Sequence, residues 1–381
     1  YNPRMLSRRD ALTQLALAGA ALKFTPAELF AQAPTAAQRF GKDKLIVRSM
    51  RPPDFETPVG LLDSFITPTE HFYVRSHMGV PASVDAATWT LKVDGEVGSP
   101  ITLSVDELKK LPAVTVTTTL ECAGNGRAFF EPAVAGIQWE KGAVGTARFT
   151  GARLSDVLKK AGVKTTGLNV EMHAGDRPPG TMPAFVRQVP MAKAMHPDTI
   201  IAWDMNGQPI PLVHGAPLRA IVPGWEGAYS VKWLNQLTVL AKDTDSFWYV
   251  TGYRYPNKRV APGAAVDAKD MEPLKGLAVK SLITAPAHNA SLAAGKVAVA
   301  GFAWAGENDI TAVDISIDNG ATWQPAKLTG EQARFTWRRF EHEFTATKAQ
   351  SYLILSRATD SKGNMQPAVA QWNPSGYLWN Q

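Results

Sequence analysis

Apolar and polar residues alternate over several short segments in the C-terminal third of the chain. Val313, Ile315 and Ile317 are apolar while the residues between them are polar, a pattern typical of a strand with one buried and one exposed face. Three neighbouring segments have a similar strand-like composition: residues 297–304, 335–344 and 351–359. Short strands at this spacing, with a hairpin-turn sequence at 318–320, predict an immunoglobulin-like β-sandwich.

The pattern before this region combines strand and helix signals. A strand is expected at 89–95, and Ser104 with Glu107 has the spacing of a capping box that begins a short helix. Residues 154–161 have the apolar spacing of an amphipathic helix, which Gly162 ends. Farther along, short strands alternate with Pro- and Gly-rich loops without a regular β-α-β order. These signals predict an α+β fold for this part of the chain.

A change in composition near residues 271–276 separates the two regions. We therefore expect a mixed domain at 34–272 and a sandwich domain at 273–381. The chain has 381 residues, of which 45% are hydrophobic, and this is sufficient for two such domains. The expected role of the sandwich is structural, either in packing on the first domain or in dimerisation.

The first 33 residues have the pattern of an export signal. Arg8 and Arg9 precede an apolar run at 15–22, and residues 31–33 are the small-residue sequence of a cleavage site. We expect a twin-arginine signal at 1–33 and a periplasmic location, with an amphipathic N-terminal helix as the alternative. No apolar run reaches the ~20 residues of a membrane span, so no membrane span is expected. Because twin-arginine export suits proteins that fold around a cofactor before crossing, the signal also indicates a cofactor.

Charge and cysteine content exclude several classes of protein. The formal net charge is +6, and no basic cluster is interleaved with aromatic residues, so nucleic acid is not an expected partner. The single cysteine excludes an internal disulfide, a thiolate zinc cluster and a C-x-x-C-H haem attachment. Neither standard glycine-rich phosphate loop is present, which argues against a Rossmann or P-loop enzyme. The mild positive charge is compatible with small anions or an acidic protein partner.

The single cysteine, Cys122, lies in the most distinctive stretch of the chain. A run rich in Thr and Val precedes it and predicts a strand that delivers Cys122 to a loop with Gly124 and Gly126. Arg127 follows in the same stretch. A thiol at a strand end, a permissive backbone and a nearby cation suit a soft metal or an anionic substrate. The alternative is that Cys122 only packs, as most buried cysteines do.

Three further groups contain candidate binding residues. Arg75 and His77 are two positions apart, so an extended strand projects both from one face. The stretch 214–232 contains arginine, lysine and glycine residues that suit a phosphate. The third group is centred on Tyr253. A histidine or tyrosine of this kind also has a purely structural interpretation, so the residues alone predict an exported two-domain protein with anion-binding loops and leave its reaction open.

Six motifs follow one another in a fixed order between about residue 50 and the C-terminus. They are Tyr73-Val74-Arg75-Ser76-His77, Glu121-Cys122-Ala123-Gly124-Asn125-Gly126-Arg127, Asp204-Met205-Asn206-Gly207-Gln208-Pro209, His214 with Arg219 and Val222-Pro223-Gly224, Val231-Lys232-Trp233-Leu234, and Asp318-Asn319-Gly320-Ala321-Thr322-Trp323. Together they closely resemble the motifs of the sulfite oxidase family of molybdenum enzymes.

The resemblance implies a fold and a set of site residues. The fold is a molybdopterin-binding catalytic domain at 34–272 followed by a dimerisation domain at 273–381. Cys122 is the implied protein ligand of molybdenum, beside a pterin dithiolene, and a soft sulfur ligand is apt for that metal. The implied catalytic residues are Arg75, Arg127 and Tyr253. The implied cofactor-binding residues are Tyr73, Arg75, His77, Asp176, His214, Arg219, Ser230 and Lys232.

The resemblance also implies a reaction, the oxidation of sulfite to sulfate by oxygen-atom transfer. The chain lacks the His-Pro-Gly-Gly motif of a cytochrome-b5-type domain, so no haem is expected in it. The expected electron acceptor is an external c-type cytochrome, and the expected assembly is a homodimer. Ser375 and Gly126 stand where many family members have arginine, which leaves substrate affinity open. Two other functions stay open: a reductase of nitrate or S-oxides on the same fold, and an exported binding protein without metal.

Overall fold

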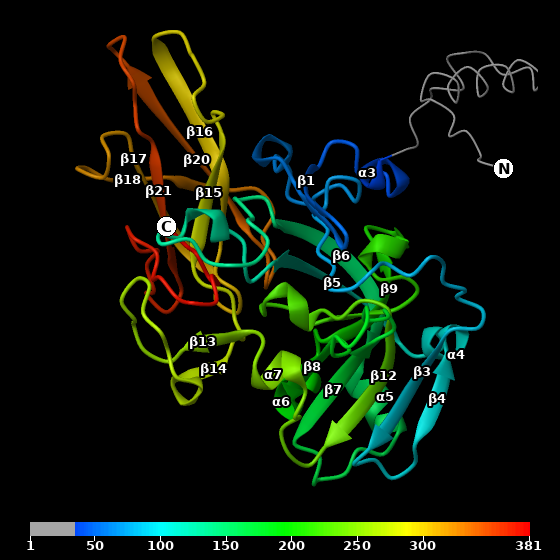
Figure 1. Cartoon of the computed structure of the whole chain (residues 1–381). Helices are drawn as coiled ribbons and strands as arrows, with labels where there is room; N and C mark the ends of the chain where they lie inside the picture. The colour runs from blue at the N-terminus through cyan, green and yellow to red at the C-terminus, as the bar shows by residue number, and fades with distance from the viewer. Residues whose placement is uncertain (1–34) are drawn as a thin grey trace, which may run out of the picture. The chain divides into compact units, whose positions relative to one another are not determined.

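The computed structural model describes residues 35–381 (Figure 1). The export signal expected at 1–33 therefore lies outside the described residues. Helix α3 (Ala36–Arg39) comes first, and residues 42–381 form one compact unit that contains both of the expected regions. The domain boundary expected between 272 and 273 stays a prediction.

Two five-stranded sheets form the framework of the first region. One contains β10-β9-β6-β5 in that order, with β11 paired to β9, and the other contains β4-β3-β12-β7-β8. All pairs within them are antiparallel except β12 with β3, which is parallel. The bounds are β3 (Thr90–Gly95), β4 (Ile101–Ser104), β5 (Ala113–Glu121), β6 (Val144–Arg153), β7 (Asn169–Ala174), β8 (Val186–Pro190), β9 (Ile200–Met205), β10 (Gln208–Pro209), β11 (Arg219–Ile221) and β12 (Leu234–Leu240).

Short helices and hairpins connect these sheets. The α-helices are α4 (Val105–Lys109), α5 (Leu154–Lys160), α6 (Met191–Ala194) and α7 (Phe247–Val250). Single 3-10 turns are η1 (Val59–Leu61), η2 (Arg127–Phe129), η3 (Leu212–His214), η4 (Gly227–Tyr229) and η5 (Ala268–Asp270). Two small hairpins pair β1 (Ile46–Met50) with β2 (Pro53–Glu56) and β13 (Arg254–Pro256) with β14 (Met271–Pro273).

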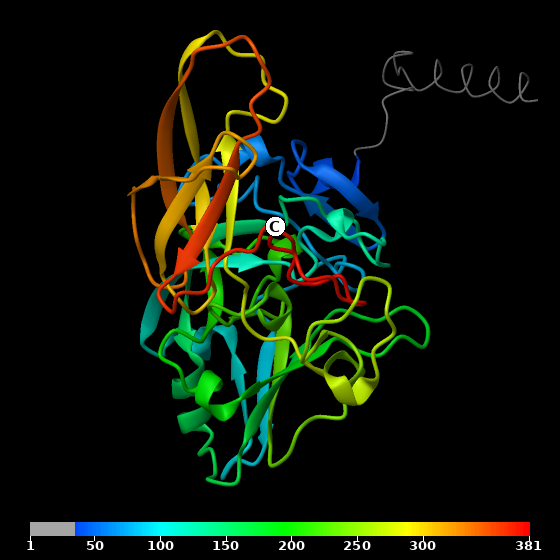
Figure 2. The ribbon, with the colours of Figure 1, turned by 90° about the vertical axis from the view of Figure 1, so that its left-hand side faces the viewer.

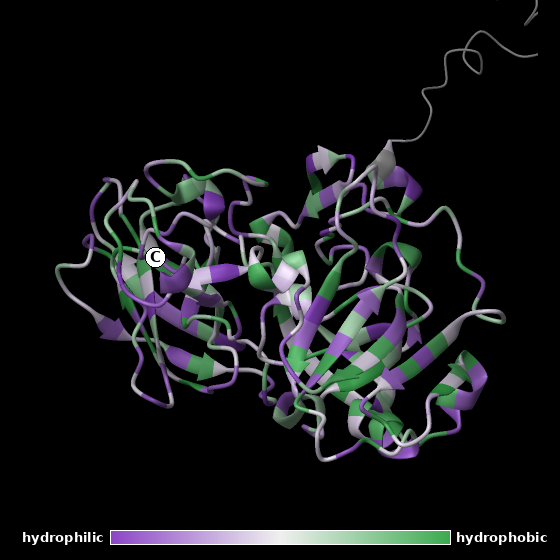
Figure 3. Ribbon diagram, turned by 60° about the horizontal axis from the view of Figure 1, so that its bottom comes forward, coloured by the Kyte–Doolittle hydropathy of each residue, from purple (hydrophilic) through white to green (hydrophobic). Residues whose placement is uncertain are grey.

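The predicted sandwich is confirmed in the second region. A four-stranded sheet has the order β15-β16-β20-β19 and a three-stranded sheet the order β18-β17-β21, and both contribute to one apolar core. Along the strands, green and purple positions alternate (Figure 3), as expected for faces that differ in burial. The bounds are β15 (Lys280–Ala285), β16 (Gly295–Trp304), β17 (Ile310–Ser316), β18 (Gln324–Pro325), β19 (Lys327–Thr329), β20 (Arg338–Ala346) and β21 (Leu355–Asp360).

Two local predictions in the first region are confirmed. Ser104 caps α4, because its hydroxyl accepts the Glu107 N–H at 3.2 Å while the Glu107 carboxylate accepts the Ser104 N–H at 2.8 Å. Strand β5 ends at Glu121, so it delivers Cys122 to a loop as expected.

The strand expected at 335–344 begins three residues late, at Arg338. Phe335 has left-handed backbone (φ 64°), which interrupts the strand. Its carbonyl accepts the Thr119 N–H at 2.8 Å, and the Trp337 N–H donates to the Thr119 hydroxyl at 2.8 Å. Residues 335–337 therefore bond to β5 of the first region instead of pairing within the sandwich.

The C-terminal segment after β21 returns to the loop of Cys122. In Figure 2 this segment is red and leaves the strands of the sandwich. The Leu378 N–H donates to the Ala123 carbonyl at 2.9 Å, and the Trp372 indole donates to the Pro132 carbonyl at 2.8 Å. The segment thus forms one wall of the region around Cys122.

Candidate active site

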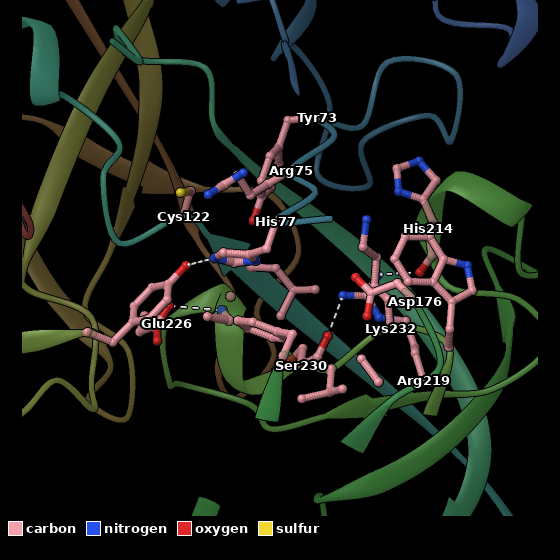
Figure 4. Close-up of a pocket in the computed structure, with 18 of the residues that line it drawn as sticks. Tyr73, Arg75, His77, Cys122, Asp176, His214, Arg219, Glu226, Ser230 and Lys232 are labelled. Carbon is pink, nitrogen blue, oxygen red and sulfur yellow. Dashed lines mark hydrogen bonds between the residues drawn. The ribbon is translucent and has the colours of Figure 1, made fainter. Parts of the chain in front are cut away.

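One cavity gathers most of the residues that the sequence singled out. Figure 4 shows Cys122, Arg75 and His77 at one side and His214, Lys232 and Arg219 at the other. Of the eleven predicted site residues, ten line this cavity: Tyr73, Arg75, His77, Cys122, Asp176, His214, Arg219, Ser230, Lys232 and Tyr253.

The Cys122 thiol lies at the wall of the cavity where β5 ends. Its backbone is held by two hydrogen bonds, from its N–H to the Ala143 carbonyl at 2.9 Å and from the Asn125 N–H to its carbonyl at 2.8 Å. Burial raises the pKa of the thiol to about 11, against the opposing effect of the Arg75 charge. The unligated thiol is therefore neutral, and a soft metal ion that takes a thiolate ligand replaces its proton.

Arg75 brings a positive charge to the same end of the cavity. Its guanidinium lies 3.2 Å from the carboxylate of Asp54, which is fully buried and also accepts the Ser76 N–H at 3.0 Å. Asp54 thus fixes the direction of the guanidinium while the side chain keeps partial access to the cavity. Figure 4 shows Arg75 beside Cys122. This position suits an anion that approaches the thiol end of the cavity.

His77 and Tyr253 form a hydrogen-bonded pair in the cavity wall. The Tyr253 hydroxyl bonds to Nε2 of His77, whose ring stacks on Phe185 with centroids 4.1 Å apart. Burial, reinforced by the Arg75 charge, lowers the pKa of His77 well below its ordinary value, so the imidazole is neutral. Burial also raises the pKa of Tyr253. The pair is therefore an uncharged, fixed hydrogen-bonding group at physiological pH.

The opposite end of the cavity contains buried cations. Lys232 donates to the Ser76 hydroxyl at 2.9 Å and to the Val213 carbonyl at 3.0 Å. Arg219 donates to the carbonyls of His214 and Ser230, both at 2.9 Å. Burial, with the neighbouring Arg219 charge, lowers the pKa of Lys232 to about 7, and burial lowers that of Arg219 to about 10. Such depressed values mean that both charges lack full compensation, which an anionic ligand would supply.

Several polar atoms at this end have no hydrogen-bond partner among residues 35–381. They are Nε of Arg219, Nε2 of His214 and Oδ1 of Asp176. Buried polar atoms are normally paired, so these unpaired atoms point to a polar ligand. A pterin with its phosphate matches them, because the heterocycle offers donors and acceptors and the phosphate offers charge for Lys232 and Arg219.

Arg127 lies outside the cavity lining, although the resemblance implied that it faces the substrate. Its guanidinium donates to the carbonyls of Ile137 at 3.0 Å and Gly376 at 3.2 Å. A Cβ atom added at Gly124, Gly136 or Gly376 would lie within 2.8 Å of that guanidinium, so the three glycines make room for it. In this structure Arg127 connects the Cys122 loop to the C-terminal segment.

The two positions where arginine is common in the family have other partners here. The Ser375 hydroxyl donates to the Arg254 carbonyl at 2.8 Å. A Cβ atom at Gly126 would lie 2.5 Å from the Trp379 ring, so the glycine leaves space for that indole. Ser375 and Gly126 therefore contribute to the packing of the C-terminal segment.

The sequence interpretation missed Glu226 and Arg187. Both are fully buried, and the Glu226 carboxylate, which lines the cavity, lies 3.4 Å from the Arg187 guanidinium. Arg187 lies against the rings of Tyr229 (4.1 Å) and Tyr253 (4.6 Å). Burial raises the pKa of Glu226 to about 7. The available signal was one acidic residue within the glycine-rich, aromatic sequence Trp225-Glu226-Gly227-Ala228-Tyr229.

A multi-residue metal site is absent from the described part of the chain. No group of three or more His, Cys, Asp or Glu side chains suited to a metal occurs within 35–381. Over the same residues, no helix has the length and apolar character needed to cross a membrane.

Comparisons with known proteins define the class first. Residues 77–248 match the family model "Oxidoreductase molybdopterin binding domain", and residues 272–381 match "Mo-co oxidoreductase dimerisation domain". The chain thus contains a molybdopterin-binding domain followed by a β-sandwich dimerisation domain, and this confirms the predicted fold.

Individual relatives narrow the class to a family. Sulfite oxidase of Gallus gallus is 36% identical over 369 residues, covering 93% of this chain and 80% of that protein. Mitochondrial sulfite oxidase of Homo sapiens is 38% identical over 352 residues, covering 88% of this chain and 64% of that protein. The sulfane dehydrogenase SoxCD of Paracoccus pantotrophus has a similar structure, with TM-score 0.76, 26% identity, and coverage of 95% of this chain and 93% of that one. The chain therefore belongs to the sulfite oxidase family, although it spans only 64% of the length of the mammalian relatives.

Proposed function

We propose that this chain is a sulfite dehydrogenase, which oxidises sulfite to sulfate with a molybdenum–pterin cofactor bound in the cavity around Cys122. The observation that carries the proposal is the arrangement of that cavity. A thiol and the Arg75 cation lie at one end, and the undercompensated cations Lys232 and Arg219 lie at the other. The similarity to sulfite oxidases over almost the whole chain supports the same reaction.

The residues at the two ends have different roles in holding the cofactor. Cys122 is the protein ligand of molybdenum. Lys232 and Arg219 bind the phosphate. Both cations are buried and donate to uncharged oxygen atoms, so a phosphate dianion would balance their positive charge. The pterin and its attached groups are held by the remaining polar residues of the lining: Tyr73, His77, Asp176, His214 and Ser230. When bound, the cofactor supplies two-electron oxygen-atom transfer, which no side chain of the protein can perform.

Arg75 and Tyr253 act on the substrate end. Sulfite oxidation consumes one water and releases two protons and two electrons for each sulfate formed. Arg75, held by Asp54, is a preorganised positive charge that attracts the sulfite anion and stabilises negative charge on it. The Tyr253 hydroxyl, held by neutral His77, hydrogen-bonds to oxygen atoms that enter or leave this end of the cavity.

The electrons pass to a separate protein. We propose an external c-type cytochrome as the acceptor. The twin-arginine pattern in residues 1–33 supports a periplasmic location for this exchange. The matched dimerisation domain supports a homodimer.

Metal analysis and a steady-state assay test the proposal together. We expect about one molybdenum per chain and sulfite-dependent reduction of cytochrome c or ferricyanide. Turnover only with a reduced dye and nitrate or an S-oxide would identify a reductase and overturn the proposal. Purified protein that lacks molybdenum and binds a small anion without turnover would identify a binding protein instead.

A further inference from the structure

Glu121, the residue immediately before the proposed metal ligand Cys122, has hydrogen-bond partners at both carboxylate oxygen atoms. The Glu121 carboxylate is buried and accepts three side-chain hydrogen bonds. Asn125 and Lys280 donate to Oε1 at 2.8 and 3.0 Å, and the Trp304 indole donates to Oε2 at 2.8 Å. A carboxylate with three donors has little freedom to rotate.

Two of these three donors come from the sandwich domain. Lys280 is the first residue of β15, and Trp304 is the last residue of β16. The Lys280 side chain is 4% exposed and its ammonium lies 5.2 Å from the ring centroid of Trp379 in the C-terminal segment. The second domain therefore extends a buried charge to the residue next to Cys122.

The same contacts continue around the Cys122 loop. The Lys280 ammonium also donates to the Asn125 carbonyl at 3.3 Å. The Asn125 side-chain oxygen accepts the Ala143 N–H at 3.1 Å, and the Ala143 carbonyl accepts the Cys122 N–H at 2.9 Å. Displacement of Glu121 would therefore be transmitted to the backbone on both sides of Cys122.

The cost of such an arrangement argues for a purpose beyond domain adhesion. A buried ion pair gives up the hydration of two charges and is commonly no more stabilising than an apolar contact of similar size. Adhesion between these domains is already available from apolar contacts, such as those of Leu62 and Val144 with Leu282 and Phe302. Residues behind a metal ligand, in contrast, have strong effects because they orient it.

We propose that Lys280 and Trp304 are positioning residues for the metal site, which hold Glu121 and thereby fix the Cys122 loop in the geometry for molybdenum. The inference depends on the proposed role of Cys122 as metal ligand. It makes the dimerisation domain an integral part of the active site of its own chain.

Two variants of the cofactor-loaded enzyme test this role. Lys280→Met keeps most of the side-chain volume and removes the donor and charge, while Trp304→Phe keeps an aromatic ring and removes only the indole donor. We expect each to lower molybdenum content or kcat for sulfite by about 10- to 100-fold, the usual effect of removing a residue behind a metal ligand. The KM for sulfite should change little, because Arg75 is untouched. The thiolate-to-metal charge-transfer absorption should shift in both variants.

A matched control separates positioning from general loosening of the domain contact. The Lys193–Glu307 pair also joins the two domains, at 2.5 Å, and neither residue contacts Glu121. Glu307→Gln should therefore leave the absorption, the molybdenum content and kcat at wild-type values. If Lys280→Met does not fold by far-UV circular dichroism, Trp304→Phe decides the question.

The outcomes distinguish this inference from the proposed function. A charge-transfer band that persists in Cys122→Ala would refute the ligand assignment itself. A band that disappears in Cys122→Ala but is unaltered in folded Lys280→Met and Trp304→Phe would refute only the positioning role. Equal effects of Glu307→Gln and Lys280→Met would also overturn it, because any weakening of the domain contact would then suffice.

Discussion

The Tyr253 hydroxyl is hydrogen-bonded to Nε2 of His77, although the two residues are 176 positions apart in the chain. Each ring is also held from its other side. His77 stacks on Phe185 at 4.1 Å, and Tyr253 stacks on Tyr377 at 5.4 Å. The hydroxyl is thus fixed in direction, as the proposed role in the reaction requires of a preorganised donor.

Tyr253→Phe tests the contribution of this hydroxyl. The ring contacts stay, so folding and molybdenum content should be those of the wild type. We expect kcat for sulfite to fall by about two- to tenfold, the equivalent of one hydrogen bond of ~0.5–1.5 kcal/mol. Stopped-flow and steady-state kinetics with sulfite measure the change. Wild-type kinetics in the variant would remove Tyr253 from the mechanism.

Cys122→Ala tests the metal ligand. Cys122 is buried at the edge of an apolar cluster, so loss of its sulfur should cost only about 1 kcal/mol of folding free energy. We expect far-UV circular dichroism close to that of the wild type and no sulfite oxidation. Retained turnover at normal protein levels would show that the thiol is not the ligand.

Lys232→Met tests the phosphate end of the cavity. A charge-assisted hydrogen bond contributes about 1.5–3 kcal/mol, so cofactor affinity should fall by about 10- to 100-fold. The readout is molybdenum and pterin content after purification and dialysis. Lys296→Met, which removes an exposed ion pair with Glu343, is the matched control and should retain its cofactor. Equal cofactor content in the two variants would contradict the assignment.

Glu226 predicts a pH dependence of stability. Burial raises its pKa from 4.5 to about 7, so between these values the folded protein keeps a proton that the unfolded chain has lost. The free energy of unfolding should therefore fall as pH rises through this window. In Glu226→Gln the side chain at this position does not titrate, so the free energy of unfolding of the variant should fall less than that of the wild type between pH 4.5 and 7. Denaturant unfolding of cofactor-free protein measures both slopes, and equal slopes would exclude the effect.

Arg127→Met separates two roles for this arginine. If Arg127 only connects the Cys122 loop to the C-terminal segment, the variant should loosen that segment and leave the KM for sulfite nearly unchanged. The Leu378 amide, which donates to Ala123, should exchange its hydrogen about tenfold faster, as expected for loss of ~1.4 kcal/mol. A large rise in KM with unchanged exchange would instead support the anion-binding role that the family resemblance implied.

Local sequence signals predicted much of the fold because they describe contacts close in the chain. The Ser104–Glu107 capping box and the strand that ends at Glu121 are examples. The start of β20 was misplaced because its outcome depends on a distant residue. Thr119 binds Phe335 and Trp337, and no pattern near residue 335 reveals this partner.

In the candidate site, too, sequence motifs predicted some features, while features that depend on residues distant in the chain were not predicted. Ten of the eleven residues implied by the motifs lie in one cavity, and their role in binding stays a prediction. The placement of Arg127 was not predictable from its motif, since three glycines from separate loops surround its guanidinium. The Glu226–Arg187 pair was missed for a similar reason: its members are 39 positions apart and meet only in the folded core.

The position of the partners of Arg127 in the sequence also determines when its contacts can form during translation. Gly376, which accepts a hydrogen bond from it, is translated 249 residues later. At ordinary elongation speeds this is a delay of roughly 10 to 50 seconds. Throughout that interval the C-terminal partner of Arg127 is missing, so this contact of the Cys122 loop forms only after nearly the whole chain has been made.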